Sequence, residues 1–140
     1  MKVTTVWNGK RSFTAKGASE FPVQMDASRE NGGDGNGATP MELLLAGLTG
    51  CMGIDLTIIL KPYTNAITRL ELEASGTRAQ AVPAGFSSIE LTVNVDGDVA
   101  ADRIWRAIRL AKEKYCPVSA SLNAELHFRL ILNGEEAVEV

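Results

Sequence analysis

Two cysteines, Cys51 and Cys116, are the residues of this chain best suited to chemistry. Cys51 lies in an apolar run over residues 41–60, and Asp55 follows it at the spacing of one helical turn. Cys116 directly precedes Pro117, and because proline favours the first position of a helix, Cys116 is predicted to be an N-cap. A helix N-terminus favours the thiolate form of a cysteine. Two cysteines without a secretory signal indicate chemistry, metal binding or no special role.

Each cysteine also has a purely structural explanation. In a buried helix, Cys51 would pack as a small hydrophobic residue, and Cys116 would be a chance residue at a helix break. Asp55 would oppose a thiolate at Cys51 unless its carboxylate is paired. A multi-histidine metal site is excluded because His127 is the only histidine, and the cysteine spacing supports no zinc site. We therefore expect neither a metal nor a cofactor.

The composition is typical of an ordinary globular domain. Of 140 residues, 45% are apolar and 22% are charged, so a single domain over residues 1–140 is expected. The net charge of −3 and the absence of a long Lys/Arg run argue against a nucleic-acid partner. The N-terminus has no apolar stretch of the kind found in secretory signals, which predicts a cytoplasmic location.

The segment 41–60 must position Cys51. Its length would suit a membrane span, but Glu42 and Asp55 lie inside it and its flanks are not basic, so no membrane association is expected. A helix that is apolar on most sides is predicted to be central and buried. Thr39, Pro40 and Glu42 have the spacing of a capping box, which predicts that the helix begins at residue 40.

The remaining pattern predicts an α+β fold. Residues 67–79 and 86–95 alternate between apolar and polar side chains and are predicted to pair as antiparallel strands. A hairpin is expected around residues 8–10, and the glycine-rich stretch 27–40 is expected to be a loop. The other predicted elements are strands at 2–7, 11–15, 21–26 and 124–132, and a helix at 99–115.

Two stretches, PMELLLAGLTGC (Pro40–Cys51) and EKYCPVSASL (Glu113–Leu122), resemble the two signatures of the OsmC/Ohr family. The element order and the loop rich in Gly and Asp are also similar to that family's. The resemblance implies antiparallel sheets around a long central helix in an intertwined homodimer. It also implies thiol-dependent reduction of organic hydroperoxides, in which Cys51 attacks the peroxide and Cys116 resolves the product. An external dithiol would then reduce the disulfide.

The resemblance further implies an arginine from the N-terminal strands that supports the thiolate, and a glutamate that holds it. Arg11 and Arg29 are the candidates for the arginine, and Glu42 for the glutamate. Glu42 stands one position later than in the Ohr branch, as in the less characterised OsmC-like members, and one helical step is a rotation of about 100°. A small-molecule-binding or structural dimer without efficient peroxidase activity is therefore the alternative function.

These considerations give three structural expectations. The apolar helix predicts a homodimer with a large apolar interface. The need for a positive partner predicts Arg11 or Arg29 within ion-pair reach of Cys51. A working pair of thiols predicts that Cys51 and Cys116 approach closely, because a disulfide needs Cα atoms about 4.4–6.8 Å apart.

Overall fold

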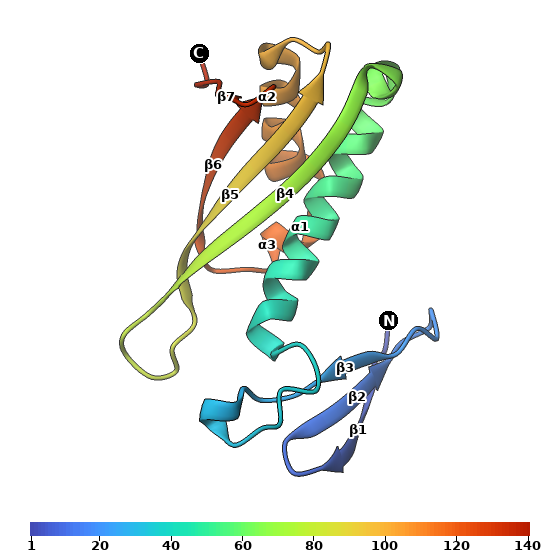
Figure 1. The fold of residues 1–140 in the computed structure, drawn as a ribbon, viewed down its shortest axis with the longest axis vertical. Coiled ribbons are helices and arrows are strands. Elements are labelled where there is room, and N and C mark those ends of the chain that lie inside the picture. Colours follow the sequence, from blue (N-terminus) through green and yellow to red (C-terminus); the bar gives the residue numbers. More distant parts are fainter. The chain divides into compact units, whose positions relative to one another are not determined.

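The computed structural model describes residues 1–140, which divide into two compact units, residues 1–44 (unit 1) and residues 45–140 (unit 2). Unit 1 is a small sheet of three strands in the order β1-β2-β3 (Figure 1). Its strands are Thr4–Gly9 (β1), Ser12–Lys16 (β2) and Val23–Met25 (β3), and each pairs antiparallel with the next. The predicted hairpin and third strand are confirmed.

The glycine-rich loop of unit 1 is organised around Asp26, whose side chain is buried. Its carboxylate accepts hydrogen bonds from the backbone N–H groups of Ala27, Asp34 and Asn36. The hydrogen bond from Asn36 is the strongest of the influences that hold the pKa of Asp26 below its usual value, and the other two bonds act in the same direction. The loop passes very close to this site, since a Cβ on Gly33 would lie only 1.9 Å from the Ala27 carbonyl oxygen. The loop therefore has a defined path, set by a buried carboxylate.

Unit 1 leaves most of its apolar side chains uncovered. Trp7 is 64% exposed and Phe21 is 78% exposed. Ala15 is the one hydrophobic residue of this unit that is buried. A sheet of this size cannot bury a core of its own, and its exposed aromatic residues are of the kind that interfaces use.

Helix α1 (Pro40–Ile59) begins and ends where the sequence predicts. Thr39 accepts a hydrogen bond from the Glu42 N–H through Oγ1 at 3.2 Å, and the Glu42 carboxylate accepts one from the Thr39 N–H at 3.4 Å, so the capping box is confirmed. The prediction of a buried helix is correct for one face only. Leu48, Met52 and Leu56 are buried at successive i, i+4 positions, whereas the opposite face is exposed.

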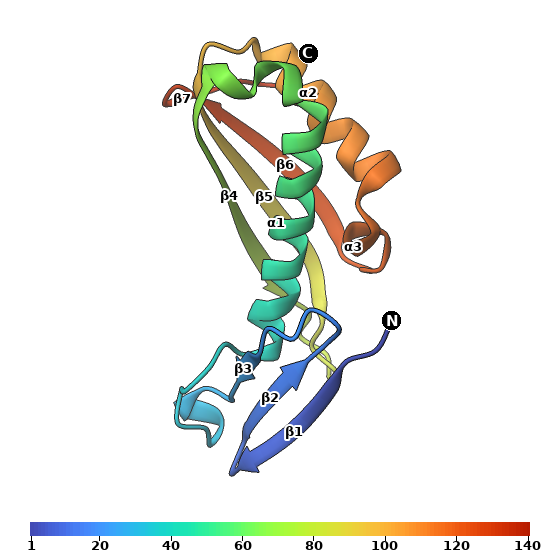
Figure 2. The ribbon, with the colours of Figure 1, turned by 90° about the vertical axis from the view of Figure 1, so that its right-hand side faces the viewer.

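One helix of the chain, α1, is long and apolar enough to span a membrane by length and composition alone. A core helix of a soluble protein meets the same criterion. In unit 2 one face of α1 packs against the sheet (Figures 1 and 2), and 17% of the apolar window of the helix is buried.

The sheet of unit 2 has four strands in the order β4-β5-β6-β7. They are Ile67–Arg78 (β4), Phe86–Gly97 (β5), Glu125–Leu132 (β6) and Glu135–Glu136 (β7). The antiparallel pair β4–β5 is confirmed, but β5 and β6 are parallel, so the expectation of purely antiparallel sheets is wrong. The reason is that the chain between them forms helices, which return it to the start of β5.

Helix α2 (Ala101–Leu110) is shorter than the helix predicted at 99–115, because residues 111–115 form a single π-helical turn. A four-residue helix, α3 (Pro117–Ala120), follows. Both α1 and α2 pack on the same face of the sheet, which is lined by the buried side chains of β5 (Figure 2). These side chains are Ile89, Leu91, Val93 and Val95. Unit 2 is therefore a two-layer α+β structure with one well-covered sheet face.

Candidate thiol site

The two cysteines meet in unit 2. The Cys116 thiol donates a hydrogen bond to Cys51 with the two Sγ atoms 3.0 Å apart, although 65 positions separate the residues in sequence. Both are free thiols. The predicted approach of the two sulfurs is confirmed. A disulfide bond has an S–S length of about 2.05 Å, so oxidation requires the sulfurs to move together by only about 1 Å.

The two thiols are held by different local structures. Cys51 is half-buried near the middle of α1, beside Met52 of the buried face. Cys116 is buried, and it is the predicted N-cap of α3, because its Sγ accepts a hydrogen bond from the Ser119 N–H at 3.4 Å. Its own N–H donates to the Ala111 carbonyl at the end of α2, at 2.8 Å. The short π-helical turn and α3 thus fix one sulfur, and α1 fixes the other.

Asp55 lies at the same site. As predicted, it follows Cys51 by one turn of α1, and its ligand oxygen and both sulfurs lie within 4.8 Å of one another. Its Oδ2 is buried and has no hydrogen-bond partner. Sequence reasoning placed Asp55 beside Cys51 but did not anticipate that Cys116 would complete a cluster of three groups. The i, i+4 spacing of Cys51 and Asp55 predicts their proximity, but it does not predict which distant segment packs on the helix.

The surroundings of Cys51 oppose its ionisation. Burial is the largest influence that raises the pKa of the Cys51 thiol, and the hydrogen bond with Cys116 and the Asp55 carboxylate act in the same direction. The backbone N–H of Val118 lowers the pKa, but less strongly than burial and the Cys116 bond raise it. Within unit 2 the Cys51 thiol is therefore protonated at neutral pH and needs a positive partner to become a fast nucleophile.

The other predicted site residues, Arg11, Arg29 and Glu42, belong to unit 1. Arg29 and Glu42 line one hollow of about 430 Å³ at the glycine-rich loop. Arg11 approaches the same loop, since a Cβ on Gly32 would lie 3.9 Å from its Nε. The structure thus brings Arg29 and Glu42 together at a hollow in unit 1. It brings Cys51 and Cys116 together in unit 2. The pairing of an arginine with Cys51 stays a prediction.

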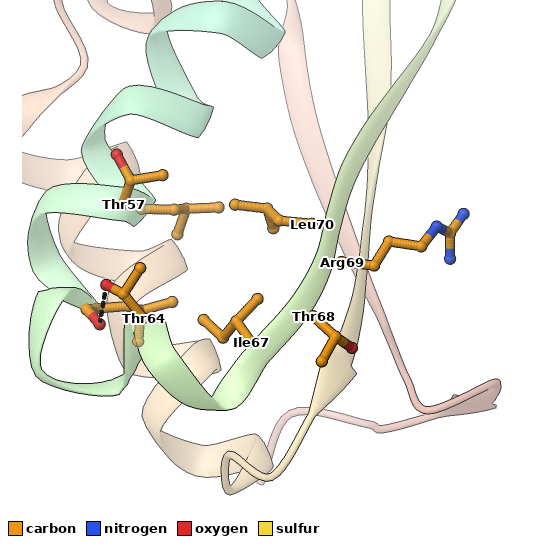
Figure 3. Close-up of a pocket in the computed structure, with 8 residues that line it drawn as sticks. Thr57, Thr64, Ile67, Thr68, Arg69 and Leu70 are labelled. Atoms are coloured by element: carbon orange, nitrogen blue, oxygen red, sulfur yellow. Dashed lines mark hydrogen bonds between the residues drawn. The ribbon is translucent and has the colours of Figure 1, made fainter.

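A separate pocket of about 220 Å³ opens between the end of α1 and the start of β4 (Figure 3). Half of its lining residues are apolar, and Arg69 points away from it in Figure 3. Its lining residues are Leu56, Thr57, Leu60, Thr64, Ile67, Thr68, Arg69 and Leu70. Neither cysteine is among them, so this pocket is distinct from the thiol site.

The fold and the paired thiols define an α+β protein with a dithiol site. The sequence model of the family described as OsmC-like protein matches residues 33–130. The chain is also 31% identical over 123 residues to protein YhfA of Escherichia coli K12, covering 87% of this chain and 89% of YhfA. The chain therefore belongs to the OsmC-like protein family, which confirms the resemblance carried by the two sequence motifs.

Solved structures show the same fold. A hypothetical protein from Aquifex aeolicus superimposes with a TM-score of 0.81 at 24% identity, over 94% of each chain. An organic hydroperoxide resistance protein from Elizabethkingia anophelis superimposes with a TM-score of 0.67 at 21% identity, over 93% of this chain and 92% of that chain. At these identities the likeness concerns the fold, and it agrees with the long helix and mixed sheets of the present chain.

Proposed function

We propose that this chain reduces organic hydroperoxides by a two-cysteine mechanism. The Cys51 thiolate attacks the peroxide O–O bond, which forms a sulfenic acid on Cys51 and releases the alcohol. The Cys116 thiol then condenses with the sulfenic acid, which gives the disulfide and one water. An external dithiol restores both thiols by exchange and is itself oxidised to a disulfide. The observation that carries this proposal is the 3.0 Å separation of the two sulfurs.

The first step needs a thiolate, and unit 2 alone disfavours one. We infer that Arg11 or Arg29 supplies the positive charge and that Glu42 holds the arginine in place. The shared hollow of Arg29 and Glu42 supports this assignment for that pair. In a homodimer the arginine can come from either chain. Replacing the responsible arginine with Ala should slow peroxide reduction and leave the disulfide-forming geometry unchanged.

We also infer a homodimer in the cytoplasm. The exposed aromatic residues of unit 1 and the uncovered outer face of α1 are apolar surfaces of the kind that a partner subunit covers. Obligate dimers bury more than about 2,000 Å² in total, so an interface of that size is expected.

A binding or structural dimer is the second candidate function. The raised pKa of Cys51 and the Asp55 carboxylate beside it favour this alternative, because both oppose rapid attack on a peroxide. The two candidates differ in what happens to the thiols when peroxide is added, so one assay separates them.

The decisive experiment measures consumption of an organic hydroperoxide with dithiothreitol as reductant. The wild-type chain should consume peroxide, and Cys51→Ser should abolish consumption above the uncatalysed rate, because the attacking sulfur is lost. Thr57→Ser is the matched control, since it changes an exposed side chain of the same helix and should retain full activity. Equal consumption by wild type and Cys51→Ser would favour the binding or structural dimer.

A further inference from the structure

The cluster of Cys51, Asp55 and Cys116 has a composition that the peroxide chemistry does not explain. A two-cysteine peroxidase needs the sulfurs, but it has no use for an unpaired carboxylate beside them. Asp55 Oδ2 is buried, and no donor of the chain hydrogen-bonds to it. Buried polar atoms in folded proteins nearly always have a partner, so an unpartnered oxygen beside two thiols points to a missing cation.

We propose that the reduced chain binds one zinc ion through Cys51 Sγ, Cys116 Sγ and a carboxylate oxygen of Asp55. Zinc is the divalent ion that accepts both thiolate and carboxylate ligands in a tetrahedral site. Softer ions such as Cu⁺ favour sulfur and gain little from a carboxylate, whereas Mg²⁺ and Ca²⁺ favour oxygen and gain little from thiols. Three protein ligands leave the fourth position for water.

The distances fit such a site after small side-chain rotations. With Zn–S of about 2.3 Å and Zn–O of about 2.0–2.2 Å, tetrahedral donors lie about 3.3–3.8 Å from one another. The sulfurs, now 3.0 Å apart, must separate by less than about 1 Å. All three donor atoms already lie within 4.8 Å of one another, so the widest pair contracts by no more than about 1 Å.

The ligands also stand on elements that can hold them. Cys51 and Asp55 occupy i and i+4 of α1, which places their side chains on one side of the helix. Cys116 approaches from the N-cap of α3. All three residues belong to unit 2. The site is therefore complete within this unit, and it requires only reduced thiols, whether or not the chain reduces peroxides.

Zinc binding and disulfide formation exclude each other, because both use the same two sulfurs. A zinc-loaded chain should resist alkylation and oxidation at both cysteines, and a chelator should restore their reactivity. A chain whose cysteines are joined in a disulfide should not bind zinc. The metal would thus act as a reversible protecting group for the dithiol.

The test uses the full chain, stripped of metal and reduced with a phosphine. Zinc affinity is measured by competition with a chromophoric chelator, and Co²⁺ serves as a spectroscopic probe of the ligands. We expect one zinc per chain, and cobalt bands from thiolate charge transfer and from tetrahedral coordination. Asp55→Asn should weaken zinc binding by at least about tenfold, because it removes a ligand charge with little change of shape. Asp98→Asn, at an exposed position, is the matched control.

Several results would overturn the proposal. Absence of zinc binding to the reduced wild type at micromolar concentrations would do so, as would equal affinity in Asp55→Asn and the wild type. Zinc binding to the disulfide form, prepared with diamide, would show that the metal lies elsewhere. If a variant fails to fold, the wild type alone tests the site. Zinc should protect both of its thiols from alkylation, and a chelator should remove that protection; thiols that zinc does not protect would contradict the proposal. None of these measurements uses peroxide, so failure of the peroxidase proposal would leave them interpretable.

Discussion

The inner and outer faces of α1 are built from similar residues but have different surroundings. On the inner face, Leu48, Met52 and Leu56 have no exposed surface, because the sheet of unit 2 covers them. On the outer face, Ile54 and Ile58 are 63% and 65% exposed. Isoleucine is among the residue types most often buried in folded proteins. Within the chain, only one of the two apolar faces of this helix is therefore covered.

The reactive groups lie between these two faces. Cys51 and Asp55 are both half-buried, and Cys51 lies at the edge of a core cluster. Cys51 packs against a buried cluster that includes Ile89 and Leu91 of β5 as well as Cys116. At this boundary between the two faces, Cys51 keeps some exposed surface while Cys116 is buried.

The largest effect is expected at this boundary. Cys116→Ser should abolish disulfide formation, so that one equivalent of an organic hydroperoxide leaves Cys51 as a sulfenic or sulfinic acid. Intact mass measures the outcome, since the wild type should lose two hydrogens while the variant should gain oxygen. Asp98→Asn, at an exposed position, is the control. An unchanged wild-type mass, with both thiols still open to alkylation, would contradict the two-cysteine mechanism.

The inner face should dominate the stability of unit 2. Leu56→Ala removes a fully buried side chain from the core and should lower the free energy of unfolding by about 2–5 kcal/mol. Thr57→Ala, at the next and exposed position, should change it by less than about 0.5 kcal/mol. Denaturant titration compares the two. Similar losses in both variants would mean that the faces of α1 do not differ as their burial indicates.

The outer face should control association rather than folding. In the proposed homodimer, the double variant Ile54→Asp and Ile58→Asp places two charges in an apolar interface. We expect the dimer dissociation constant to rise by more than about 100-fold, or about 2.7 kcal/mol, while helix content is retained. Sedimentation equilibrium and circular dichroism measure the two quantities. Val82→Asp, at a position 91% exposed in the β4–β5 turn, is the control. A wild-type chain that is monomeric at micromolar concentration would end the dimer proposal.

Local signals in the sequence predict much of this fold. The capping box of Thr39 and Glu42 and the alternation in β4 and β5 depend on neighbouring residues, and all are confirmed. The approach of Cys116 to Cys51 was also predicted, through the family resemblance rather than from spacing. The parallel pairing of β5 with β6 was missed, because alternation within a strand does not report the direction of its neighbour.

Other features of the structure could not be predicted from the sequence for a similar reason. The role of Asp26 depends on backbone N–H groups of a loop, which carry no side-chain signature. The cluster with Asp55 forms only because α3 packs on α1, and no spacing rule connects segments so far apart. That the apolar helix would keep an uncovered face was anticipated, but the apolar pattern does not tell which face that is.

The smallest effect is expected from the charge of Asp55. Because burial raises the pKa of Cys51, its alkylation should be slow at neutral pH and should accelerate as the pH rises through that raised pKa. Asp55→Asn removes one of the influences that raise the pKa, so the whole profile should shift to lower pH. Alkylation at neutral pH should then be about two- to tenfold faster than in the wild type.

This shift has the same sign whether or not an arginine reaches Cys51, because a negative charge beside a thiol always opposes its ionisation. Peptide mass mapping after timed alkylation with iodoacetamide, in the presence of a chelator, measures Cys51 alone. Unfolded chain in denaturant gives the reference profile, with the pKa at its ordinary value. Asp98→Asn should leave the wild-type profile unchanged. A profile of Asp55→Asn that coincides with the wild type, or moves to higher pH, would mean that the carboxylate does not act on the thiol, and the boundary of α1 would then have no electrostatic role.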